Sequence, residues 1–141
     1  VYKKVNARLY FVKQLSQLNV NHKILALFYT SIVQSVLSFS IICWYGNCNI
    51  ESKNRLTRVI KNCTKLGIVQ ASSIEDIYRK CTIQCCKVIM NDVSHPLNNL
   101  YTLLPSGRRL RSVAGRTARY TKSFVPNSVR LINDLRLNLE F

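Results

Sequence analysis

Residues 24 to 45 read ILALFYTSIVQSVLSFSIICWY, and this run decides the fold because no charged residue lies between Lys23 and Glu51. The run shows no alternation of apolar and polar residues, so it predicts a helix rather than a surface strand. Asn21 is a good N-cap and Gly46 a good stop, which predicts one long helix between them. The side chains expected among its more buried ones are Ile32, Val36, Phe39 and Trp44.

An apolar run of this length can also cross a bilayer, which takes about 20 apolar residues. The run is not purely apolar, however, because small polar side chains recur in it at helical spacing: Ser31, Ser35 and Ser38. Such a stripe suits close packing of a buried helix against its neighbours better than contact with lipid. We therefore expect a core helix, with a membrane-associated helix as the alternative.

The sequence on both sides of this run also has helical periodicity, and no strand pattern is found. Residues 2 to 18 predict an amphipathic helix with one basic side and with Val5, Leu9 and Val12 inward, the apolar stripe being widened by Phe11, Leu15 and Leu18. Further helices are predicted over about 50–66, over about 73–91 and after Pro126. Their expected inward side chains are Leu56, Val59, Ile60, Cys63 and Leu66, then Ile77, Cys81, Val88 and Ile89, and finally Val129, Ile132 and Leu135.

These patterns predict an all-α fold. We expect a small helical bundle of about four to five helices, with a basic, irregular Arg-rich segment before the last helix. Two parts are expected: a helical segment over 1–92, and a basic C-terminal segment with a final helix over 93–141. The sequence starts inside a predicted helix and without an initiator Met, so we expect a piece of a longer protein.

The charge balance indicates an anionic partner. The chain has 21 Lys and Arg against 6 Asp and Glu, a formal net charge of +15, whereas a small soluble domain typically carries about 2 to 8. Residues 93 to 133 include six arginines and Lys122 but no acidic residue. Only a polyanion satisfies such a field along its length, so nucleic acid is the leading partner, an anionic membrane surface is second, and a merely solubilising charge is the alternative.

Two sets of basic residues are the candidate nucleic-acid contacts, which would meet phosphates rather than read bases. They are Lys3, Lys4, Arg8 and Lys13 in the first helix, and Arg108, Arg109, Arg111, Arg116, Arg119 and Lys122 in the Arg-rich segment. Tyr120 and Phe124 are candidate stacking platforms, with simple packing as the alternative.

The cysteines do not form a metal-binding or disulfide pattern. No Cys-x-x-Cys occurs among the six cysteines, and the two histidines, His22 and His95, are far apart in sequence. We expect buried or half-buried free thiols in a reducing compartment, hence an intracellular protein of the nucleus or cytoplasm. No metal site and no cofactor are predicted.

The order of several motifs resembles the post-palm region of LINE-type (non-LTR) retrotransposon reverse transcriptases. The blocks that carry this resemblance are residues 7–15, 28–37 and 44–47, then Ser94-His95-Pro96-Leu97, residues 103–111, and the short segments 116–117, 119–120, 123–126 and 130–133. The resemblance implies a thumb-like and C-terminal fragment of an RNA-directed DNA polymerase that binds template and primer, with the polymerase palm of the parent chain as a further partner. A structural module that docks on that palm, or an inactive relic, is the alternative.

The resemblance also implies an absence of catalysis. Polymerisation by two metal ions needs paired aspartates, and Asp76, Asp92 and Asp134 are not adjacent.

The first helix is also similar to segments that carry a label from the AlkB-homologue family of alkylation repair proteins. A dioxygenase of that kind needs a His-x-Asp pair for iron, and neither His22 nor His95 has an acid two residues later, so we expect no repair activity.

Overall fold

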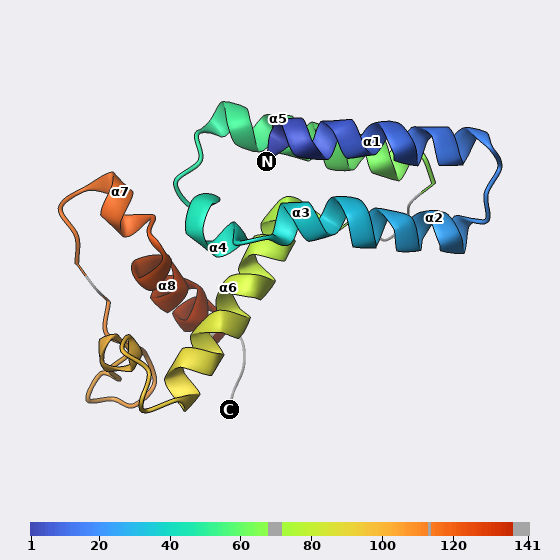
Figure 1. Ribbon diagram of the computed structural model, residues 1–141. Helices are drawn as coiled ribbons and strands as arrows, with labels where there is room; N and C mark the ends of the chain where they lie inside the picture. The colour runs from blue at the N-terminus through green and yellow to red at the C-terminus, as the bar shows by residue number, and fades with distance from the viewer. Residues whose placement is uncertain (68–71, 113, 137–141) are drawn as a thin grey trace. The chain divides into compact units, whose positions relative to one another are not determined.

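The computed structural model describes residues 1–67, 72–112 and 114–136, and these residues are mostly helical, with no strand among them (Figure 1). The predicted all-α fold is therefore confirmed. Contacts divide the chain into two compact units. Unit 1 consists of Val1–Ile41 with the described residues of Cys48–Tyr78, and unit 2 consists of Ile42–Asn47 with the described residues from Arg79 onward. The predicted division into 1–92 and 93–141 stays a prediction; residues 113 and 137–141 of its second part lie outside the described residues.

Unit 1 contains two amphipathic helices that pack together, α1 (Tyr2–Gln17) and α5 (Ile50–Lys65) (Figure 1). Their buried side chains are Val5, Leu9 and Val12 in α1, and Leu56, Val59, Ile60 and Cys63 in α5, as predicted. Phe11 and Leu18 were expected to widen the stripe of α1, but they are 56% and 73% exposed. At about 100° of rotation per residue, both point away from the line of Val5, Leu9 and Val12.

The central apolar run is not the single α-helix that we predicted. It forms α2 (His22–Phe28), a π-helical segment η1 (Tyr29–Gln34), α3 (Ser35–Ser38) and, after a turn, α4 (Ile41–Trp44). The predicted N-cap is confirmed, because the Asn21 side chain accepts a hydrogen bond from the backbone N–H of Lys23 at 2.9 Å. The helical path breaks where Ser40 adopts a positive φ of 48°, a conformation that costs energy for a residue other than glycine.

The buried side chains of this run follow a strict four-residue spacing. They are Leu25, Tyr29, Val33, Leu37, Ile41 and Tyr45. In a regular α-helix a four-residue step turns by about 400° and so drifts by about 40° each time. The wider i→i+5 turns of η1 oppose that drift. Over α2, η1 and α3 the buried side chains therefore stay directed at the core of unit 1.

The predicted buried set was wrong because it assumed an uninterrupted α-helix. Phe39 is 75% exposed, and Ile32, Val36 and Trp44 are only half-buried. The serine stripe is also not a packing surface, since Ser31 and Ser35 are exposed. Hydroxyl groups here bond to the helix itself: that of Thr30 donates to the carbonyl of Ala26 at 2.9 Å.

By length and composition, His22–Trp44 is apolar enough to cross a membrane, and 28% of its most apolar window is buried. Ile24 and Leu27, on the side of α2 away from the core, are 57% and 67% exposed. The choice between a core helix and a membrane-associated helix stays a prediction.

Unit 2 is built on α6 (Ile74–Asn91), whose residues from Arg79 belong to it, and on α8 (Phe124–Arg136). Two short elements, η2 (Asn98–Leu100) and α7 (Ala118–Thr121), lie between them in sequence. Its core consists of Cys86, Ile89, Tyr101, Leu110, Val129 and Ile132. The predicted inward positions Ile89, Val129 and Ile132 are confirmed, whereas Val88 is 58% exposed.

Candidate functional site

The Arg-rich segment contains a small hairpin, residues 102–111. An antiparallel bridge joins Leu103 to Leu110. Backbone hydrogen bonds of 2.8 Å link Arg111 N–H to the Thr102 carbonyl and Leu104 N–H to the Arg109 carbonyl. Gly107 closes the turn with a positive φ of 68°, which glycine adopts without strain. The hairpin is therefore locally ordered, although no helix lies within residues 102–111.

The hairpin is attached to the core of unit 2 by Leu110. This side chain is 1% exposed, and the Asn133 side chain of α8 bonds to both polar groups of its backbone. The Leu110 N–H donates to Asn133 Oδ1 at 2.8 Å, and Asn133 Nδ2 donates to the Leu110 carbonyl at 3.0 Å. A buried hydrogen bond of 2.8 Å between the Tyr101 and Ser128 hydroxyls lies in the same unit, and burial raises the pKa of Tyr101 to about 12.

Three exposed arginines are presented by this attached hairpin: Arg108, Arg109 and Arg111. Within the part of the chain that the structure describes, none of the three guanidinium groups makes a hydrogen bond or an ion pair. The sequence supplies no acid between Val93 and Asn133. The hairpin thus holds three closely spaced positive charges in place without a counter-charge from its own segment.

The other cations predicted in the Arg-rich segment lie on different elements. Arg116 lies in the loop before α7, Arg119 is in α7, and Lys122 follows it, all three exposed. Of the two predicted stacking residues, Phe124 is half-buried against the unit 2 core. Tyr120 is 42% exposed, but the backbone of Gly115 lies so close to its ring that a Cβ there would be 2.0 Å from Cδ1. For both aromatics the structure therefore favours the packing alternative.

The cations of α1 do not share one face, contrary to the predicted basic side. Arg8 is half-buried and its Nη1 donates to the Ile32 carbonyl at 2.8 Å, so it faces η1. Lys13 lies on the other flank, near Cys63 of α5. Burial raises the pKa of Cys63 to about 11, and the charge of Lys13 opposes that rise. The cations diverge because steps of about 100° per residue spread the positions 3, 4, 8 and 13 around the helix.

Sequence reasoning did not include in the site an exposed basic ridge on α5, made of Arg58, Lys61 and Lys65. Their spacing of three and four residues places them on one side, opposite the buried stripe. Arg55 is not part of this ridge, because it pairs with Glu51 at 2.5 Å. That spacing already indicates a basic outward face in the sequence, although these residues were not included among the candidate nucleic-acid contacts.

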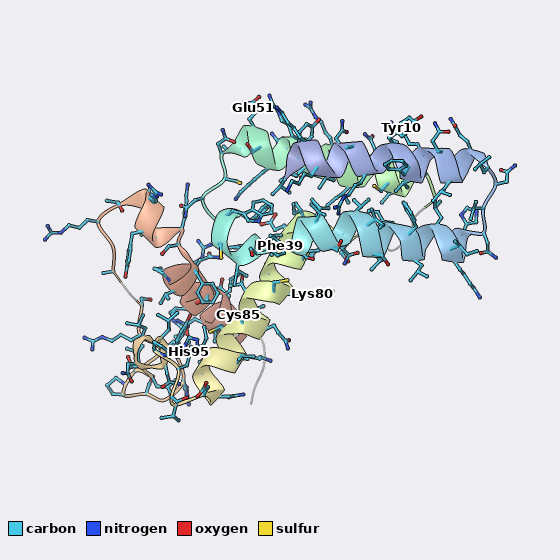
Figure 2. The ribbon with its side chains drawn as sticks, viewed as in Figure 1. Tyr10, Phe39, Glu51, Lys80, Cys85 and His95 are labelled. Atoms are coloured by element: carbon cyan, nitrogen blue, oxygen red, sulfur yellow. The ribbon has the colours of Figure 1, made fainter. Side chains whose placement is uncertain are left out.

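A feature that was missed from the sequence is a pair of exposed aromatics on α1. The rings of Tyr10 and Phe11 meet edge to face, with centroids 5.7 Å apart, and the side chains are 59% and 56% exposed. Tyr10 is labelled in Figure 2. The same rotation of about 100° per residue would have placed both outside the apolar stripe.

The six cysteines are all free thiols, as predicted, although Cys43 is exposed rather than buried. Over the described ranges, no three His, Cys, Asp or Glu side chains come together in a way that could hold a metal ion.

Comparison with known proteins gave one family match. The N-terminal 35 residues, 1–35, match the family described as alkylated DNA repair protein alkB homolog 8, N-terminal. The match covers α1, α2 and η1 and ends at the first residue of α3. No curated protein and no solved structure matched the chain. Because the match covers residues 1–35 of 141, it is a local similarity and does not assign the chain to that family.

This match contradicts the resemblance to retrotransposon reverse transcriptases. The function drawn from that resemblance, a thumb-like C-terminal fragment of an RNA-directed DNA polymerase, is contradicted with it. Short blocks such as Trp44-Tyr45-Gly46-Asn47 consist of residues that many helical proteins use for packing and helix ends, so their order was weaker evidence than it looked.

Proposed function

We propose that this chain binds nucleic acid through phosphate contacts made by the hairpin 102–111. The observation that carries the proposal is the attachment of the hairpin, because Leu110 and Asn133 fix the backbone that presents Arg108, Arg109 and Arg111. Arginine guanidinium groups suit this role, since they can bind phosphate oxygens in a bidentate manner.

The competing explanation is surface charge that only keeps the protein soluble. Three cations within four residues repel one another, and a segment without acids has no internal means of reducing that repulsion. A flexible loop would relieve the repulsion by spreading, whereas this hairpin is held by paired backbone hydrogen bonds. A fixed cluster of positive charge is better explained by an anionic partner.

The matched family description names a protein of alkylated DNA repair. That name concerns a protein that acts on DNA, and it is consistent with a nucleic-acid partner for this chain. The proposal assigns binding to the chain and assigns it no catalysis.

The proposal is tested by replacing Arg108, Arg109 and Arg111 with Ala and measuring affinity by fluorescence anisotropy at about 100 mM salt. Three lost phosphate contacts should weaken binding by about a hundredfold or more. Two unrelated duplex sequences should be affected alike, because phosphates carry no base identity.

The matched control removes the same charge from α6, by changing Arg79, Lys80 and Lys87 to Ala. These side chains are exposed and lie outside the hairpin (Lys80 is labelled in Figure 2). The control should weaken binding by much less than the hairpin variant. Equal losses in the two variants would show that net charge, and not the hairpin, determines affinity.

A further inference from the structure

Unit 1 contains an open groove that the hairpin does not use. It lies between the N-terminal half of α1 and α3, with a volume of about 430 Å³. Its lining residues are Val1, Lys4, Arg8, Ser35, Val36 and Phe39. Sites for small molecules commonly have about 300 to 1,000 Å³, so the groove is large enough for one small ligand or one unit of a polymer.

The α1 side of the groove is positive and partly fixed. Lys4 and Arg8 are four residues apart and so neighbour each other on the helix, an arrangement of like charges that destabilises a helix. The half-buried guanidinium of Arg8 is oriented by the Ile32 carbonyl at 2.8 Å. A guanidinium has five N–H donors, so this bond leaves others for a ligand. Among the residues that the structure describes, no acidic side chain lines the groove, and an anion would relieve the repulsion.

The α3 side of the groove is mostly apolar and ends in an aromatic ring. Val36 is half-buried. Phe39 lies just after α3 and is labelled in Figure 2; its side chain is 75% exposed. The Ser35 hydroxyl donates to the Ser31 carbonyl of its own helix, so it adds little charge or polarity to this side. An aromatic face beside two cations is the arrangement that proteins use to bind single strands, with the base on the ring and the phosphate on the charges.

We infer that this groove binds one nucleotide of a single-stranded nucleic acid, with its phosphate at Lys4 and Arg8 and its base against Phe39. An acyl chain fits the groove less well, because it needs apolar walls on both sides and the α1 wall carries two cations. The inference rests on the proposed nucleic-acid function but concerns a separate unit of the chain. It predicts a specific selectivity: bases in a duplex are already stacked, so the groove takes single strands only, whereas the hairpin binds phosphates of both.

The test compares the full chain with its Phe39→Leu variant, using a short oligothymidine and a duplex of equal length. Phe39 is exposed, so a leucine there should leave the helical content unchanged. Loss of one base–aromatic stack should raise the dissociation constant for the single strand about tenfold and leave duplex affinity unchanged. A Lys4→Gln variant should also weaken single-strand binding more than duplex binding.

The matched control is Phe11→Leu, which removes an exposed ring of α1 outside the groove lining. It should leave both affinities unchanged. If Phe39→Leu and Phe11→Leu act alike, or if Phe39→Leu weakens duplex binding equally, the groove inference is wrong while the hairpin proposal stands. If the unmodified chain binds neither polymer, the proposed function itself fails. If Phe39→Leu loses binding to anionic lipid vesicles but still binds oligothymidine, the ligand of the groove is a lipid and not a nucleotide.

Discussion

The two units of this protein carry positive charge in different ways. In unit 1 the cations lie on helices, and Arg8 and Arg55 have internal partners: Arg8 bonds to the Ile32 carbonyl, and Arg55 pairs with Glu51. In unit 2 the side chains of the hairpin arginines make no such contact among the described residues. The hydrogen bonds of the hairpin are made by its backbone instead. Cations without a contact among the described residues, carried by a backbone that hydrogen bonds fix, are a stronger indication of a binding site than cations that are paired internally.

The attachment of the hairpin gives the largest predicted effect on stability. Leu103 and Leu110 face each other across the bridge, but Leu110 is 1% exposed and Leu103 is 51% exposed. Leu110→Ala should lower the free energy of unfolding by about 2 to 5 kcal/mol, because it opens a cavity in a packed core. Leu103→Ala should change it by about 0.5 kcal/mol or less, as is usual for surface positions. Urea denaturation of both variants measures the difference, and equal effects would show that the hairpin is not anchored by Leu110.

Loss of the Asn133 side chain gives the next effect. Asn133→Ala leaves the N–H and carbonyl of the buried Leu110 without hydrogen bonds, which should cost about 1 to 3 kcal/mol of unfolding free energy. Asn99, which is exposed, supplies the control substitution Asn99→Ala, with little expected change. Hydrogen exchange of the Leu110 amide should accelerate in Asn133→Ala; an unchanged rate would mean that this amide is protected by another group.

The fold class and most helix boundaries followed from periodicity and capping residues. The Asn21 cap is an example, since its side chain accepts from the Lys23 N–H at 2.9 Å, as predicted. The central run was predicted less well, because a π-helical segment and a break at Ser40 depend on packing that no local pattern encodes. As a result, the buried positions of the run are Val33 and Leu37 and not the predicted Val36 and Phe39.

The arginines of the candidate site could be predicted from the sequence, but the contacts that hold the hairpin could not. The arginines were evident from charge, whereas the contact between Leu110 and Asn133 joins positions 23 residues apart. The prediction that a base stacks on Phe124 had less support, because an aromatic side chain at the start of a helix can face either the core or solvent. Tertiary packing decides between the two.

The smallest effect concerns unit 1, where the Tyr29 side chain is 1% exposed and its hydroxyl has no hydrogen-bond partner among the described residues. Tyr29→Phe should therefore leave the free energy of unfolding unchanged at pH 8, or raise it by up to about 1 kcal/mol. A clear loss of stability in this variant would mean that the hydroxyl has a partner.

The same residue gives a pH dependence. Burial, with a smaller effect from Cys63, raises the pKa of Tyr29 from 10.0 to about 12. The unfolded chain therefore ionises first, so the stability due to this group is complete below pH 10 and is lost as the pH rises toward 12. Urea denaturation at pH 8 and pH 11 should show a smaller loss in Tyr29→Phe than in the unmodified chain; equal losses would assign the alkaline destabilisation to Tyr101 and Cys63 instead.

The central claim, that the hairpin arginines meet phosphates, is tested most directly by the salt dependence of duplex binding. Each neutralised phosphate contributes about −0.9 to the slope of log K against log salt, so engagement of about five charges predicts a loss of about three decades between 50 and 200 mM. Replacing Arg108, Arg109 and Arg111 with Ala should make the slope shallower by about 2 to 3 units. An unchanged slope, with helical content intact, would contradict the claim and leave the cations of α1 and the basic ridge of α5 as the candidates.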